Sequence, residues 1–354
     1  MSYYSMLGLS TFNIENGFLE ALARSFRDAL LTRADYQNLM QCERLDDLKL
    51  HLSSTDYGNF LADVPGALKT SMLEKRAWDK LVGEFEHMRL QAVQPLAQFM
   101  EYIRYQYMID NVVFLITGTL HGKDAETLLS KCHPLGKFDS MATLTVATTA
   151  AELYDYVLVE TPLAGYFVNA SLQEGDLDEM NIEIIRSTLY KAYLEDFYKF
   201  VCSLGGVTAS VMKEILEFEA DRRSINITIN SFGTELSVDD KKKLYPSFGQ
   251  LYPEGIDKLL KAEDLDMVRA AVDFYTPLDQ FFDDVDGIGG DSLEDKFIAH
   301  EVHLHKESFN QQYHLGVFYS FLKLKEQEIR NLLWIAECIA QNQRDQMTKF
   351  VPMW

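Results

Sequence analysis

NIEIIRSTLYKAYLEDFYKFVCSL, residues 181–204, decides the fold class of this chain. Its apolar residues follow one another at intervals of three or four positions: Ile182, Ile185, Leu189, Tyr193, Phe197, Phe200 and Leu204. Because an α-helix turns once in about 3.6 residues, this spacing lines one face of a long helix with apolar side chains. The same spacing recurs near the C-terminal end, between Ile329 and Ala340. The sequence therefore predicts an all-α protein.

The composition agrees with a helical globular class. The 354 residues include only 8 Pro and 19 Gly, and the hydrophobic and charged fractions of 47% and 25% are ordinary for a folded protein. The formal net charge of −21 argues against nucleic acid and anionic lipid as direct partners, since both would be repelled. Much of this charge is local, because residues 263–295 hold 11 acidic residues and one basic residue.

Three segments of the chain resemble one another and indicate an internal repeat. They are LDDLKLHLSSTDYGNFL (45–61), AELYDYVLVETPLAGYF (151–167) and LDMVRAAVDFYTPLDQFF (265–282), registered on Leu48, Leu153 and Val268 at spacings of 105 and 115 residues. A second set of related segments follows, at 107–118, 218–233 and 325–340. We therefore predict three helical modules, over residues 1–140, 141–245 and 246–354.

One segment reads locally as a strand. Ile225 to Asn230 alternates strictly between β-branched and polar residues, which favours β structure. Its two counterparts in the repeat have clear helical spacing, so we assign it to a helix. Helix starts are predicted where a hydroxyl residue precedes an acid by three positions, as in a capping box: at Thr32–Asp35, Thr149–Glu152 and Ser292–Asp295.

Targeting and membrane signals are weak. The N-terminal stretch lacks the basic and apolar regions of a signal peptide, and the longest strongly apolar runs have five residues where a spanning helix needs about 20. We expect a cytosolic protein, or one that is peripheral on a cytosolic face. The four cysteines are far apart and form no CxxC pair, which argues against a zinc or redox motif.

The sequence gives little support for catalysis. The densest histidine cluster, His300, His303 and His305, lacks the H-E-x-x-H spacing of a zinc hydrolase, and a solvated helix face is the favoured interpretation. There is no phosphate-binding glycine loop and no nucleophile elbow. We expect no catalytic, cofactor-binding or metal-binding residues and no cofactor.

Charged clusters in the second set of repeat segments are candidates for partner binding. Glu219–Arg223 and Glu326–Arg330 have the favourable acid-first i, i+4 order, which stabilises a helix by about 0.2–0.5 kcal/mol per pair. They are ordinary helix pairs, or they present polar groups to a docked partner from equivalent helices. The candidate interface residues are Asp110, Asn111, Glu219, Asp221, Arg222, Arg223, Glu326, Glu328 and Arg330.

Long stretches of the chain resemble subunit d of the eukaryotic vacuolar-type proton-pumping ATPase, which is related to the C subunits of archaeal-type rotary ATPases. The resemblance runs from about Asn16 to the C-terminus. It is carried by residues 16–61, by YMIDNVVFLITGTLHG (107–122), KCHPLG (131–136), residues 176–200, EFEADRRSINITINSFGTELS (217–237), YPEGI (252–256) and GVFYSFLKLKEQEIRNLLWIAECIAQ (316–341).

The resemblance implies a funnel of three similar helical modules in a pseudo-threefold arrangement, and a non-catalytic role. A member of this family sits on the cytosolic end of the proteolipid ring, as a peripheral protein of vacuolar or endosomal-type membranes. It receives the central stalk, made of D-type and F-type subunits, with the a-type subunit of the pump as a further expected neighbour. It would turn with the ring and couple ATP hydrolysis to proton transport. No nucleic acid is expected, and membrane association would run through protein partners.

On this basis the candidate residues are expected to line the funnel or its mouth. Charge reversal at Arg222 or Glu328 should then weaken stalk docking without unfolding the protein. Two alternatives stay open: a helical adaptor outside the pump, and a soluble hydrolase that uses the three histidines with a metal.

Overall fold

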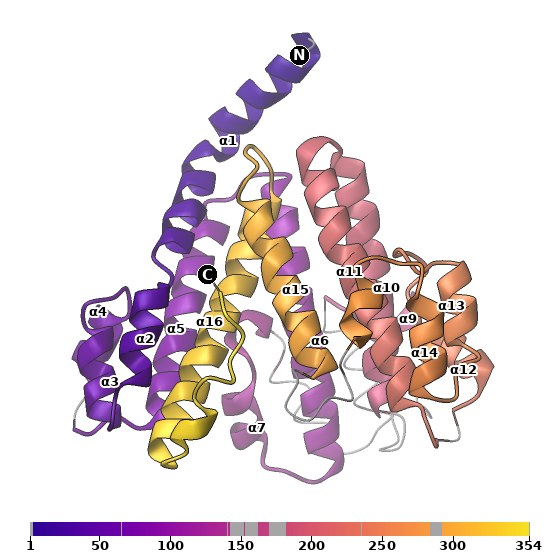
Figure 1. Ribbon diagram of the computed structural model, residues 1–354. Coiled ribbons are helices and arrows are strands. Elements are labelled where there is room, and N and C mark those ends of the chain that lie inside the picture. The colour runs from indigo at the N-terminus through magenta and orange to yellow at the C-terminus, as the bar shows by residue number, and fades with distance from the viewer. Residues whose placement is uncertain are drawn as a thin grey trace. The chain divides into compact units, whose positions relative to one another are not determined.

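All regular elements that the structure describes are helices (Figure 1). The computed structural model describes residues 3–353 except 65, 140, 142–151, 153–161, 170–181, 235 and 284–291. The predicted all-α class is therefore confirmed over these residues. None of the described helices is both long enough and apolar enough to cross a lipid bilayer.

Three helices of equal length recur along the chain. They are α6 (Leu96–Leu120), α11 (Gly206–Asn230) and α16 (Gly316–Ala340), each of 25 residues, and successive helices begin 110 residues apart. Each follows another long helix: α5 (Thr70–Arg89), α10 (Ile182–Leu204) and α15 (Leu293–Ser308), respectively. The second set of repeat segments found in the sequence lies in, or ends just after, the C-terminal half of these 25-residue helices.

The short helices of the repeat also keep their register. Helices α3 (Leu45–Leu52) and α4 (Gly58–Ala62) are followed 220 residues later by α14 (Leu265–Val272) and the 3-10 helix η5 (Leu278–Phe282). Leu48 and Val268, which register the repeat, are both fully buried. Most of the middle copy, 151–167, lies outside the described residues. The module boundaries after residues 140 and 245 stay a prediction.

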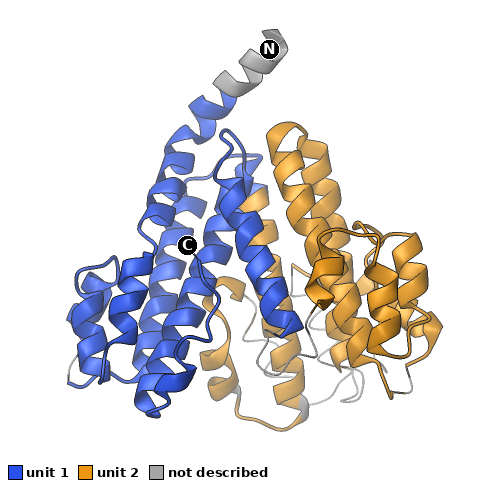
Figure 2. Ribbon diagram, viewed as in Figure 1, with its two compact units in different colours: residues 1–98, 291–354 blue, residues 99–290 orange. Residues whose placement is uncertain are grey.

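The chain divides into two compact units (Figure 2). Unit 1, residues 1–98 and 291–354, joins the two ends of the chain. It contains α1 (Tyr3–Asp28), α2 (Arg33–Met40), α3, α4, α5, α15, α16 and the 3-10 helix η6 (Arg344–Gln346). Helix α16 packs against α1, α5 and α15 and is buried on nearly all sides from Val317 to Ile329. Any charged residue in that stretch must therefore find its partner inside the unit.

Unit 2, residues 99–290, is organised around the pair α10 and α11, which lie side by side. It also holds most of α6, with α7 (Ala125–Lys131), the 3-10 helix η1 (Pro134–Gly136), α9 (Ala164–Asn169), α12 (Val238–Leu244), α13 (Glu254–Leu259), α14 and η5. Aromatic rings fill its core, where Tyr102 stacks on Phe197 at 5.1 Å between ring centroids. Helices α12, α13 and α14 contact α11 at one edge of the unit (Figure 1).

Local sequence signals explain several helix boundaries. Capping boxes are present at Thr32–Asp35 and Ser292–Asp295, as predicted, whereas the box predicted at Thr149–Glu152 lies outside the described residues. The segment from Ile225 to Asn230 is helical and forms the last turns of α11, so its assignment is confirmed. Ile225 and Thr228 lie three positions apart and are both fully buried, so helical spacing decides which side chains face the core.

Candidate functional site

The sixteenth residue of each 25-residue helix is a buried polar residue. These residues are Asn111, Asp221 and Asn331, with exposed fractions of 3%, 1% and 2%. Each hydrogen-bonds to the backbone of a segment that follows its helix and carries a proline. We call the three the anchor residues. Since buried polar groups are costly without partners, this recurrence indicates that each anchor fixes the connector beyond its helix.

Asn111 anchors the segment after α7. Its Nδ2 donates to the backbone oxygen of His133 at 2.9 Å, and its Oδ1 accepts from the His133 backbone nitrogen at 2.7 Å. A Cβ on Gly136 would lie 2.5 Å from Asn111 Nδ2 and 2.3 Å from the Tyr107 backbone oxygen. The glycine of KCHPLG therefore lets this segment reach α6 closely enough to be anchored.

Asp221 anchors the connector between α12 and α13. Its carboxylate accepts from the backbone nitrogens of Gln250 at 2.8 Å and Leu251 at 3.1 Å. Gly249 has φ +120°, and a Cβ there would lie 2.3 Å from Asp221 Oδ1. Burial raises the pKa of Asp221 to about 7, although the two backbone N–H groups act in the opposite direction.

The raised pKa of Asp221 predicts a pH dependence of stability in unit 2. The folded state binds this proton up to about pH 7, while the unfolded chain releases it near the usual value of 3.8. The free energy of unfolding should therefore fall as the pH rises from about 5 to 7, by up to about 1.4 kcal/mol per pH unit. Hydrogen exchange of the unit 2 amides, corrected for intrinsic rates, measures it. In Asp221→Asn this contribution should vanish, and equal slopes in both proteins would contradict the assignment.

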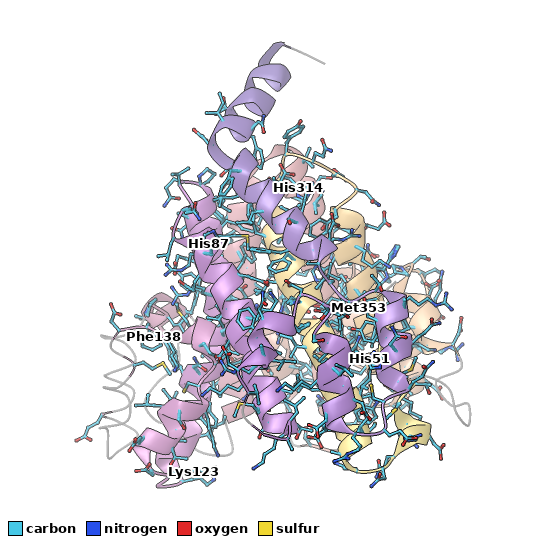
Figure 3. The ribbon with its side chains drawn as sticks, turned by 90° about the vertical axis from the view of Figure 1, so that its left-hand side faces the viewer. His51, His87, Lys123, Phe138, His314 and Met353 are labelled. Carbon is cyan, nitrogen blue, oxygen red and sulfur yellow. The ribbon has the colours of Figure 1, made fainter. Side chains whose placement is uncertain are left out.

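Asn331 is not among the candidates from the sequence, although the 110-residue period of the repeat points to it. Its Nδ2 donates to the Val351 backbone oxygen at 2.8 Å, and its Oδ1 accepts from Gln327 Nε2 at 2.8 Å. Its Nδ2 also lies 3.4 Å from the hydroxyl of Tyr36, which donates to Met353 Sδ at 3.7 Å (Met353 is labelled in Figure 3). Asn331 thus joins α2, α16 and the C-terminal segment.

Four of the predicted candidates form a charged group in unit 2. Arg222 Nη2 and Arg223 Nε each lie 2.6 Å from an oxygen of Glu219. The Arg223 guanidinium carbon lies 3.8 Å from the ring centroid of Tyr190, whose hydroxyl donates to Asp110 at 2.8 Å. The predicted Glu219–Arg223 pair is therefore present. Glu219, Arg222 and Arg223 are half-buried and Asp110 is exposed, so this group is accessible to a partner.

The other three candidates lie on α16 in unit 1 and differ sharply in exposure. Arg330 is exposed, whereas Glu326 is buried and lies 3.3 Å from Lys323 Nζ. Glu328 is fully buried, so reversing its charge would disturb the core of unit 1. Of the two reversals proposed from the sequence, only the one at Arg222 separates partner binding from folding.

Glu328 belongs to a buried charged network. Its Oε1 lies 2.7 Å from Lys325 Nζ and accepts from the Tyr57 hydroxyl at 2.7 Å, and its Oε2 accepts from the Leu31 backbone nitrogen. Lys325, also fully buried, places its ammonium 4.3 Å from the centroid of the Tyr57 ring. Burial and the Glu328 charge raise the pKa of Tyr57, which keeps its hydroxyl protonated as a donor.

The network continues into α5. Lys325 Nζ lies 4.0 Å from Asp56, whose carboxylate is 2.7 Å from Lys80 Nζ, and Lys80 is also 2.6 Å from Glu84. Burial raises the pKa of Glu84, against the opposing effects of Lys325 and Lys80. Three acids and two bases thus connect α16, α5 and the segment after α3 inside unit 1.

The three histidines of α15 lie in different environments. His300 is half-buried, His303 is exposed, and His305 is buried with its Nδ1 3.1 Å from Ser320 Oγ. Burial and the neighbouring His303 lower the pKa of His300 to about 4. Over the part of the chain that the structure describes, no three His, Cys, Asp or Glu side chains are placed to hold one metal ion.

Comparison with known proteins gives the family. The model of the ATP synthase (C/AC39) subunit family matches residues 19–350. V-type proton ATPase subunit d of Dictyostelium discoideum is 58% identical, covering 98% of this chain and 97% of the relative. Subunit d1 of the same pump from Arabidopsis thaliana is 53% identical, covering 95% and 96%. The C subunit of the A-type ATP synthase of Pyrococcus abyssi is more distant, at 23% identity over 93% and 88%. The chain therefore belongs to the family of V-type proton ATPase d subunits, within the wider ATP synthase (C/AC39) subunit family.

Proposed function

We propose that this chain is a non-catalytic rotor subunit of a vacuolar-type proton pump, which couples the central stalk to the proteolipid ring. The observation that carries the proposal is the identity of 58% to a V-type proton ATPase subunit d over nearly the whole length of both chains. Its partners would be the ring, the D-type and F-type stalk subunits and the a-type subunit, on the cytosolic face of vacuolar or endosomal-type membranes.

The construction of each unit suits the transmission of torque. A coupling element must not deform under load, and close-packed helical cores have low compressibility. In unit 1 the network around Lys325 and Glu328 ties α16 to neighbouring segments with charged contacts of 2.7 Å. In unit 2, Asn111 and Asp221 attach connectors to the long helices. Both features support a stiff element whose loops do not yield.

The accessible candidates remain the proposed contact residues for partners. They are Asp110, Glu219, Arg222 and Arg223 in unit 2 and Arg330 in unit 1. The buried candidates, Asn111, Asp221, Glu326 and Glu328, would support these surfaces from within.

A covalent link between this chain and the ring tests the rotor role. In sealed vesicles that contain the pump, the chain is joined to the proteolipid ring with a cleavable bifunctional reagent, and ATP-driven acidification is measured. A rotor subunit turns with the ring, so we expect acidification to persist. As control, a link to the stationary a-type subunit should stop acidification until the reagent is cleaved.

Two results would overturn the proposal. Acidification that stops when the chain is linked to the ring, and recovers on cleavage, would show that the two move relative to each other. Purified pump that lacks this chain at one copy per ring would instead favour the helical adaptor outside the pump.

A further inference from the structure

Helix α14 exposes an apolar stripe on the surface of unit 2. Met267, Ala270 and Phe274 follow the i, i+3, i+7 pattern, with Phe274 two residues beyond the helix end. Phe274 is 84% exposed and Met267 42% exposed, and Ala270 is also exposed. Three such residues along one helical face form a contact line for another helix.

This stripe is not a result of loose packing. The opposite face of α14 is fixed in the core of unit 2 by Val268, Ala271 and Val272, all nearly or fully buried. The N-terminus of the helix is capped by Asp264, whose side chain accepts from the Met267 backbone nitrogen at 2.8 Å. The helix therefore presents the stripe in a defined orientation.

The repeat shows that the fold does not require the stripe. In the matched helix α3, which begins 220 residues earlier, the corresponding positions are Asp47, Leu50 and Ser54. Leu50 is 71% exposed, but Asp47 serves the capping of α3 and Ser54 is polar, so no continuous apolar line forms. The same structural position thus carries an apolar line in α14 and not in α3.

The surroundings of the stripe are acidic. Glu263, Asp264, Asp266 and Asp273 are all exposed next to it. Residues 254–283 hold eight acids and three bases, a net charge of −5. Among the bases, Arg269 is 3.0 Å from Asp283, and Lys258 lies 5.2 Å from the Phe274 ring centroid.

We propose that this face of α14 binds a basic amphipathic helix of a partner protein. Apolar side chains of the partner would cover Met267 and Phe274, while its lysines or arginines would meet Asp266 and Asp273. A second copy of this chain would bring an equally acidic face, and an anionic membrane would also be repelled. The proposal does not depend on the rotor role, because it rests on this surface alone.

Peptide binding to the full chain tests the proposal. The probe is a fluorescent 18-residue helical peptide of leucine and lysine in amphipathic order, and fluorescence anisotropy gives its Kd. Met267→Ser combined with Phe274→Ser should weaken binding by about tenfold or more, because most of the apolar contact is lost. The matched control Leu50→Ser should leave the Kd unchanged, and circular dichroism checks that each variant is folded.

The charge requirement is tested separately. Asp266→Lys combined with Asp273→Lys should also weaken binding and make the Kd less sensitive to salt. Equal binding of a matched leucine–glutamate peptide, or an equal loss of affinity in Leu50→Ser, would overturn the proposal. So would sedimentation showing that the chain self-associates through Phe274.

A second measurement uses the assembled pump. A photoreactive phenylalanine analogue is placed at position 274, and at position 50 as control. The expected result is a cross-link from position 274 alone to a partner peptide that carries net positive charge and an amphipathic pattern. A cross-link from position 274 to lipid, or to an acidic peptide, would overturn the proposal.

Discussion

Replacing Lys325 with methionine is expected to lower the free energy of unfolding of unit 1 by about 3–5 kcal/mol. Lys325 is fully buried, and its ammonium lies 2.7 Å from Glu328, which is also fully buried. Without Lys325, the Glu328 carboxylate would keep its hydrogen bonds from Tyr57 and Leu31 but lose its nearest positive charge. A buried carboxylate without a counter-ion is among the most costly changes a core can suffer.

Tryptophan fluorescence during denaturant unfolding measures this effect, because Trp78, Trp334 and Trp354 all belong to unit 1. The double variant Lys325→Met/Glu328→Gln should recover more than half of the loss. Glutamine removes the unpaired charge, and its side-chain oxygen can still accept from Tyr57 or Leu31. A double variant no more stable than Lys325→Met alone would show that the pair is not coupled.

A matched control separates burial from the loss of an ion pair. Arg89 lies 2.8 Å from Glu86 on α5, with the same i, i+3 spacing, but both side chains are more than a quarter exposed. Arg89→Met should therefore cost less than about 1 kcal/mol. If Arg89→Met and Lys325→Met cost the same, burial would not be the source of the effect.

The long helices show what the sequence predicts well. Ile182, Leu189 and Phe197 on α10 face the core at the spacing that predicts an amphipathic helix. The segment from Ile225 to Asn230 shows the limit of that signal, since its alternation is also typical of a strand. Only comparison between copies of the repeat assigns it correctly, because the copies share one backbone structure.

The charged residues of α16 show what the sequence cannot predict. Glu326, Glu328 and Arg330 have the spacing of an exposed ion-pair face, yet Glu328 is buried and Arg330 is exposed. The difference depends on α5, α15 and α1, which surround α16 on several sides and, apart from α15, are remote from it in sequence. Helical spacing gives the direction of a side chain around its own axis, but it does not say how many neighbours surround the helix.

The anchor residues lie between these cases. The sequence correctly marks Asn111 and Asp221 as special polar positions but assigns them to partner binding, whereas the structure shows them hydrogen-bonded to His133 and to Gln250. Asn331 escapes that reasoning because it is neither charged nor part of an ion-pair pattern. The 110-residue spacing of the helices, applied position by position, places all three together.

Replacing Gly249 with alanine is expected to lower the free energy of unfolding of unit 2 by about 2–4 kcal/mol. Two costs combine. A side chain at φ +120° is strained in any L-residue, and the new Cβ would lie 2.3 Å from Asp221 Oδ1. Asp221 is buried and held by the backbone nitrogens of Gln250 and Leu251, so it cannot move aside without losing those hydrogen bonds.

Two comparisons separate these costs, with thermal unfolding and hydrogen exchange of Gln250 and Leu251 as the measurements. Gly233 has φ +72°, and a Cβ added there would meet no atom within 4 Å, so Gly233→Ala should cost only the backbone strain, about 1–2 kcal/mol. In an Asp221→Ala background the collision is absent, and Gly249→Ala should then cost no more than Gly233→Ala. An undiminished cost in that background would mean that the glycine serves the local backbone alone. A diminished cost would establish that Gly249 is glycine so that Asp221 can hold the connector before α13 against α11.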